Sequence, residues 1–174
     1  MKLIEDKKSK SKSFYLKDSY KKLSNEACSF LINFSKQNNI CDVRLCIHES
    51  PKSEQHNMLL IQTKKNYYVP HKHLKTGDTI LVLRGNLACF LFDAHGRVTY
   101  KCVLRKNEIF KTPTNVFHTF LPLTSQVLMY ETKKGPFVRS SNHTIFPKWC
   151  PSKDDSKKVI DDYKKKLFNK VKDL

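Results

Sequence analysis

Long apolar runs are absent from this sequence. A helix needs roughly 20 consecutive apolar residues to cross a bilayer, and no segment comes near that length. The N-terminal residues 1–13 are mostly charged or polar and lack the apolar stretch of a secretory signal. We therefore expect a cytoplasmic protein with no transmembrane segment. Its 174 residues fit a single domain with short extensions.

Several motifs of known chemistry are also missing. The six cysteines include no C-x-x-C pair, so we expect reduced thiols, buried as small hydrophobic groups, rather than a disulfide framework. The sequence contains no P-loop, no G-x-S-x-G and no Rossmann glycine pattern. Phosphoryl transfer, serine hydrolysis and dinucleotide chemistry therefore lose support.

Arginine is scarce although the chain is strongly basic. The formal net charge is +17, and it comes mainly from lysines concentrated in the two tails. Proteins that read bases and phosphates usually rely on the planar fork of arginine. We therefore expect solvated lysine surfaces, with nucleic acid not the main partner. Nucleic-acid binding through the tails is the alternative, and it predicts a steep salt dependence.

The central part of the chain, residues 43–151, has the pattern of a β-barrel. Apolar and polar residues alternate there with period two, and short segments are separated by turn signals such as Asp93-Ala94-His95-Gly96. This pattern predicts a mainly β fold, an antiparallel sandwich or barrel. The expected strands are 44–48, 58–63, 67–73, 78–84, 87–92, 97–104, 108–111, 116–121 and 126–132.

Helices are expected on both sides of this region. Residues 1–13 read as a flexible basic arm, and residues 14–42 as a helical extension in which apolar residues recur at three- and four-residue spacing from 19 to 36. Asp18 or Ser19 is the expected cap of that helix. Residues 152–174 read as a C-terminal amphipathic helix that packs on the barrel or on a partner subunit, with contact to a membrane surface as the alternative.

Three histidines and one aspartate form the pattern that carries chemistry. His71 and His73 lie two apart in an extended segment, which places both imidazoles on one face of a strand. Asp78 follows five residues later, and His118 opens another strand downstream. Three imidazoles and one carboxylate suit Zn²⁺, Fe²⁺, Mn²⁺ or Ni²⁺. We therefore expect one divalent metal ion per chain.

The spacing of these residues resembles the two cupin motifs. His71, His73, Asp78 and Gly85 match the first motif, H-x-H, four residues, an acid, six residues and glycine, except that aspartate replaces the usual glutamate. Asp78 is one methylene shorter, so its part as a ligand is open. The segment 113–118 matches the second motif, P-x-G-x-x-H, with asparagine in place of glycine, a swap that the left-handed conformation allows.

Longer segments are similar to the WbuC family of cupin-fold metalloproteins. The likeness runs from about 44 to 151, and it implies a cupin barrel, or double-stranded β-helix (jelly roll), with an N-terminal helical extension. With the C-terminal helix expected above, the barrel has N-terminal and C-terminal helices. Family members commonly occur in gene clusters for bacterial O-antigen or capsule sugars, and their reaction is not established. The segments that carry the likeness are 67–73, 82–85, 91–98, 131–137 and 147–151, together with Arg44 and His48.

Other polar residues are candidates for the pocket. Tyr67 shares the parity of the two histidines, so it is a candidate for substrate binding or proton transfer, with a core aromatic as the alternative. Arg44 and His48 share one strand face and could hold an anionic substrate group. Glu131 lies on an apolar strand face, where a carboxylate is either functional or paired, for example with Arg44.

The resemblance and the residues together predict a metal-dependent cupin acting on a sugar or nucleotide-sugar intermediate of surface-polysaccharide (lipopolysaccharide) synthesis. Isomerase- or epimerase-like chemistry at a Lewis-acidic metal is the leading expectation. A non-haem iron oxygenase and a non-enzymatic, metal-dependent sugar-binding module are the alternatives. A homodimer is also expected, because cupins commonly pair through sheet edges.

Overall fold

The computed structural model describes residues 1–9, 11–137 and 144–174. Most of the regular structure is strand, as the period-two pattern predicts. The elements are β1 Leu3–Glu5, β2 Lys12–Leu16, α1 Asn25–Gln37, β3 Asp42–Cys46, β4 Gln55–Thr63, β5 Lys72–His73, β6 Thr79–Arg84, β7 Leu87–Phe92, β8 Val98–Leu104, β9 Ile109–Lys111, β10 Phe117–Pro122, β11 Gln126–Lys134, β12 Thr144–Ile145 and α2 Lys157–Asn169.

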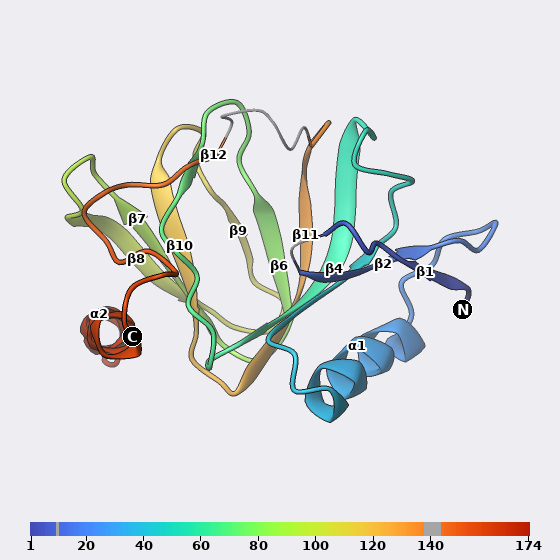
Figure 1. Cartoon of the computed structure of the whole chain (residues 1–174), viewed down its shortest axis with the longest axis horizontal. Coiled ribbons are helices and arrows are strands. Elements are labelled where there is room, and N and C mark those ends of the chain that lie inside the picture. The colour runs from blue at the N-terminus through green and yellow to red at the C-terminus, as the bar shows by residue number, and fades with distance from the viewer. Residues whose placement is uncertain (10, 138–143) are drawn as a thin grey trace.

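Two sheets form the body of the protein (Figure 1). The larger has the strand order β1-β2-β3-β4-β11-β6-β9 and the smaller the order β10-β7-β8, while β12 and β5 form a separate pair. Neighbouring strands are antiparallel except for the parallel pair β2 and β3. This arrangement confirms the mainly β, jelly-roll architecture predicted from the sequence.

The core between the sheets consists of side chains that alternate along each strand. Because directly paired residues of neighbouring strands point to the same face, each strand contributes every second residue to this interior. The buried residues of the interior are Cys46, Met58, Leu60, Ile80, Val82, Leu87, Cys89, Leu104, Phe120, Val127 and Met129. All six cysteines are free, and Cys46 and Cys89 are the two that are fully buried.

Helix α1 covers the outer face of the larger sheet. Its buried Ala27 and Leu31 pack in a second apolar cluster with residues of β2, β3, β4 and β11. The helix begins at Asn25 rather than near residue 19, because the Ser24 side chain accepts a hydrogen bond from the Ala27 backbone N–H and caps the first turn. Asp18 and Ser19 are therefore not the cap.

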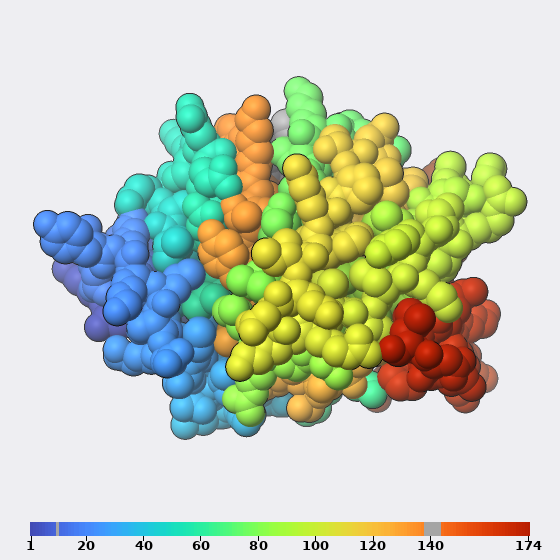
Figure 2. Space-filling view, turned by 180° about the vertical axis from the view of Figure 1, so that it is seen from behind, coloured from blue at the N-terminus to red at the C-terminus, as the bar shows by residue number. Residues whose placement is uncertain are grey.

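The segment before α1 contains two strands. Residues 1–13, expected as an arm, include β1 and the start of β2. Strand β1 forms one edge of the larger sheet, and β2 lies between β1 and β3. Figure 2 shows these N-terminal residues and α2 at opposite ends of the surface. The division of the chain into arm, helical extension, barrel and C-terminal helix stays a prediction.

Helix α2 packs against the smaller sheet through its apolar stripe. Leu167 and Val171 are buried, and Tyr163 is partly buried, in a cluster with Phe90 and Phe92 of β7. The later part of the predicted stripe therefore packs on the barrel, whereas Val159 at its start is exposed. Neither α1 nor α2, nor any other helix in the described part of the chain, is long and apolar enough to span a membrane.

Candidate metal centre

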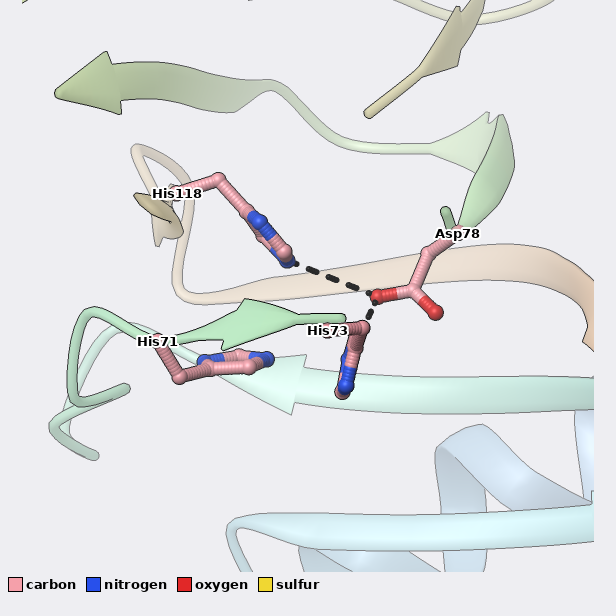
Figure 3. Close-up of side chains that lie close together, drawn as sticks. All are labelled: His71, His73, Asp78 and His118. Atoms are coloured by element: carbon pink, nitrogen blue, oxygen red, sulfur yellow. Dashed lines mark ion pairs between the residues drawn. The ribbon is translucent and has the colours of Figure 1, made fainter. Parts of the chain in front are cut away.

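Four side chains converge at one end of the interior: His71, His73, Asp78 and His118 (Figure 3). Each offers one ligand atom, and these atoms all lie within 4.8 Å of one another. The Nε2 atoms of His73 and His118 lie 3.3 Å and 3.5 Å from the same Asp78 oxygen, Oδ2. The structure therefore brings together all four residues that the sequence predicts as ligands, including the shorter carboxylate.

Backbone pairing fixes the histidines beside one another. His71 and His118 form an isolated antiparallel bridge, with hydrogen bonds from each backbone N–H to the other residue's carbonyl at 3.0 Å and 2.8 Å. The Asn115 N–H donates to the His73 carbonyl at 2.8 Å. Asn115 has a φ of 60°, which confirms that asparagine takes the left-handed conformation expected at the glycine position of the second motif.

Hydrogen bonds to Thr112 fix the backbone of Asp78. The Asp78 backbone N–H donates to Thr112 Oγ1 at 2.8 Å, and the Thr112 N–H donates to the Asp78 carbonyl at 2.9 Å. Thr112 is fully buried, and Asp78 is 4% exposed. The backbone of Asp78 is thus fixed at the entrance to β6, so the carboxylate reaches the histidines with little freedom.

Backbone carbonyls set the tautomers of two histidines. Nδ1 of His71 lies 2.9 Å from the Val69 carbonyl, and Nδ1 of His118 lies 3.0 Å from the Val116 carbonyl. Since a carbonyl can only accept a hydrogen bond, each Nδ1 carries the proton. In the neutral ring Nε2 then keeps its lone pair and points at the centre, which is the arrangement of histidine ligands in metal sites.

The electrostatics of the centre favour the ligand forms of these residues. Burial, and then the neighbouring His118, lower the pKa of His71 to about 4, so His71 is neutral near pH 7. Burial opposes the charged form of Asp78, but the Lys133 ammonium holds the pKa of its carboxyl well below the usual range. His71 therefore presents a neutral imidazole, and Asp78 an ionised carboxylate.

Two buried polar atoms at the centre lack a hydrogen-bond partner among the residues that the structure describes. They are Nε2 of His118 and Oδ1 of Asp78. A buried polar group without a partner costs roughly 1–3 kcal/mol, and such groups in native structures often mark the place of an ion. The donor set, the fixed tautomers and the unpartnered His118 nitrogen all fit a divalent cation.

The other predicted site residues lie outside this cluster. The Tyr67 hydroxyl donates to the Pro151 carbonyl at 2.9 Å, and its ring packs against Tyr163 of α2. His48 is buried and stacks on His56, with ring centroids 4.2 Å apart. The structure therefore does not bring Tyr67 or His48 into contact with the four ligands, and their roles stay predictions.

Glu131 lies next to the cluster, but its partner differs from the expected one. Glu131 Oε1 forms an ion pair with Lys133 Nζ at 3.2 Å, and the same ammonium lies 3.6 Å from Asp78 Oδ1. Arg44 pairs in register with Leu60, whose side chain belongs to the interior core, so Arg44 points to the same face. Glu131 is thus paired with Lys133 rather than with Arg44 as the sequence analysis considered.

Lys133 is the residue near the centre that the sequence analysis missed. The alternation along the strand could have identified it, because Lys133 continues the two-residue period of Val127, Met129 and Glu131 on the inner face. Strand β11 runs to Lys134, whereas the expected strand ends at 132. The continuation places an ammonium group beside Asp78.

We expect the stability of the folded protein to depend on pH through the stacked pair His48 and His56. Burial lowers the pKa of both imidazoles below the ordinary value, so the unfolded chain binds more protons than the folded one at mildly acidic pH. The stabilisation is complete above about pH 6.5 and is lost as the pH falls below it. We expect the urea midpoint of metal-free protein to fall between pH 7 and pH 5.

A double variant, His48→Phe with His56→Phe, is expected to make that fall shallower because it removes both groups. The matched control is His95→Phe, which changes a histidine in an exposed turn and should keep the slope of the parent protein. An unchanged slope in the double variant would show that the acid sensitivity arises elsewhere.

Comparison with a solved structure supports the fold. A family model described as "Domain of unknown function (DUF6016)" matches residues 25–104, and no curated protein matches the chain. Among solved structures, CapF with the inhibitor 3-isopropenyl-tropolone has a TM-score of 0.50 at 14% identity and covers 60% of this chain. The chain covers only 31% of the CapF chain, less than a third.

Two further structures are similar at lower scores. KdgF from Halomonas sp. has a TM-score of 0.44 at 16% identity, covering 52% of this chain and 77% of its own. An oxalate oxidase has a TM-score of 0.43 at 15% identity, covering 53% of this chain and 46% of its own. The likeness to CapF, together with the two facing sheets, shows that this chain has the cupin fold. It carries a His₃Asp cluster compatible with a divalent metal site.

Proposed function

We propose that this protein is a metal-dependent cupin of the WbuC family that acts on a sugar or nucleotide-sugar intermediate of bacterial surface-polysaccharide synthesis. One observation carries the metal part of the proposal. Four ligand atoms from His71, His73, Asp78 and His118 lie within 4.8 Å of one another at the end of the interior. The WbuC-like segments between 44 and 151 support the pathway.

The proposed site takes one divalent ion per chain. His71, His73 and His118 would hold it through Nε2, and Asp78 through its carboxylate. When bound, the ion supplies a Lewis acid that polarises a carbonyl or hydroxyl oxygen of the substrate. Zinc, iron, manganese and nickel all suit three imidazoles and one carboxylate.

Glu131 is the preferred candidate for moving a proton at this site. Its side chain is 13% exposed and lies on the inner face of β11, paired with the Lys133 ammonium. Tyr67 is the weaker candidate, because its hydroxyl donates to the Pro151 carbonyl and burial raises its pKa far above the usual value. Arg44 and His48 remain candidates for substrate binding, and a cytoplasmic homodimer belongs to the same proposal.

The proposal is tested by incubating metal-loaded protein with a set of nucleotide sugars in D₂O and following the sugar protons by NMR. An isomerase or epimerase exchanges a sugar C–H proton for deuterium, and a new set of sugar signals follows. The His118→Ala variant is the control and should show neither change. Turnover that requires both iron and O₂ would favour the oxygenase alternative, whereas metal-dependent sugar binding without any turnover would favour the binding module.

A further inference from the structure

The two oxygens of the Asp78 carboxylate face different groups. Its Oδ2 atom faces His73 and His118, at 3.3 Å and 3.5 Å from their Nε2 atoms. Its Oδ1 atom faces the Lys133 ammonium at 3.6 Å. One oxygen is therefore directed at the metal centre and the other at a cation of the protein.

The Lys133 ammonium is enclosed at the edge of the centre. Its side chain is 21% exposed, and its two ion-pair partners in the described chain, Asp78 and Glu131, are 5% and 13% exposed. An ammonium group has three N–H donors. Glu131 Oε1 lies 3.2 Å from Lys133 Nζ, whereas Asp78 Oδ1, at 3.6 Å, lies beyond hydrogen-bond distance, so at least one donor is left for a ligand.

The charges beside the histidines favour an anion. Three neutral imidazoles and one carboxylate leave one positive charge on a divalent ion, and the Lys133 ammonium adds another next to it. Glu131 offsets only part of this charge. A neutral hydroxyl group gains little from such a field, whereas an oxyanion gains from both the ion and the N–H donor.

We propose that Lys133 and the four-residue centre form one anion subsite, so that the substrate presents an oxyanion group, a carboxylate or a phosphate, to the metal. This inference rests on the proposed metal function and names the class of ligand that the centre accepts. Lys133 provides the N–H donor for that oxyanion, and Glu131 tunes the affinity by partly neutralising Lys133.

The test uses full-length protein loaded with Co²⁺, because the visible spectrum of bound Co²⁺ responds to ligands without any need for turnover. Acetate and inorganic phosphate are titrated separately, which distinguishes a carboxylate from a phosphate preference. Cobalt stoichiometry is measured on the same samples. The variants are Lys133→Met and Glu131→Gln, and the control is Lys134→Met, which changes the exposed lysine on the opposite face of β11.

We expect Lys133→Met to bind cobalt but to bind the preferred anion about tenfold more weakly or worse, as the loss of one charged hydrogen bond implies. Glu131→Gln should bind the anion more tightly, and Lys134→Met should equal the parent. General damage to the fold would weaken anion binding in both inner variants, so the opposite signs are diagnostic. If Lys133→Met does not fold, Glu131→Gln decides alone: tighter anion binding supports the subsite, and equal or weaker binding overturns it.

Two results separate this inference from the proposed function. Parent protein that binds no cobalt contradicts the metal centre itself. Parent and Lys133→Met proteins that bind cobalt and the anions with equal affinity contradict the subsite and leave the metal centre standing. Loss of cobalt from Lys133→Met also overturns the subsite, because Lys133 would then act by positioning Asp78.

Discussion

The Asp78→Asn variant is expected to bind divalent metal about 100-fold more weakly than the parent protein, or worse. Replacing partners that only support a ligand commonly costs 10–100-fold in metal affinity, and this change removes the charge of a ligand itself. The amide also leaves the Lys133 ammonium, 3.6 Å from Oδ1 in the parent, without one of its counter-charges next to the ion. Both effects reduce affinity.

The measurement for this variant is a competition titration of Zn²⁺ against a chelating dye of known affinity. The matched control is Asp154→Asn, which makes the same chemical change at an exposed aspartate after the barrel and should bind as the parent does. An Asp78→Asn affinity within about threefold of the parent would show that the three histidines hold the ion without the carboxylate. The shorter acid at this motif position would then be a structural residue.

Metal removal is expected to lower the thermal stability of the parent protein substantially. An ion present at about 100 times its Kd stabilises the folded state by about 2.7 kcal/mol, provided that the unfolded chain does not bind it. For a chain of this size, that corresponds to a Tm shift of about 5–10 °C. Adding a chelator should reverse the shift completely.

The control for this prediction is the His71→Ala variant, scanned with and without the same metal. The Tm of this variant should change little when metal is added, because the variant lacks the His71 imidazole, one of the four proposed ligands. A parent protein whose Tm is the same with metal and with chelator would argue against a site that binds in the folded state. An equal upward shift in parent and variant would place the bound ion elsewhere on the protein.

The sequence predicts the clustering of the four candidate ligands well, because local patterns tie these residues together. His71 and His73 share a face through two-residue alternation, and His118 is fixed by the turn before β10. Sequence-local patterns do not reveal that the backbone of His118 pairs with that of His71. That contact depends on how two distant segments meet, and only the resemblance to the cupin motifs anticipates it.

The residues around the centre are predicted less well, for reasons of register. Tyr67 is assigned to the pocket by strand parity, but β5 contains only Lys72 and His73, so the alternation does not extend back to residue 67. The partner of Glu131 is set by where β11 ends, and that end lies two residues beyond the expected one. An error of one or two residues in a predicted strand end thus changes which polar side chains are predicted to be in contact.

The central claim is tested most directly by measuring the metal content of untagged protein by elemental analysis, for the parent and for His71→Ala and His118→Ala. We predict about one divalent ion per chain in the parent and a loss of that ion in both variants, with circular dichroism showing that all three are folded. Iron as the native metal would point to oxygenation, and zinc or manganese to Lewis-acid chemistry. Folded parent protein that holds no metal even after reconstitution, or variants that retain it, would contradict the account.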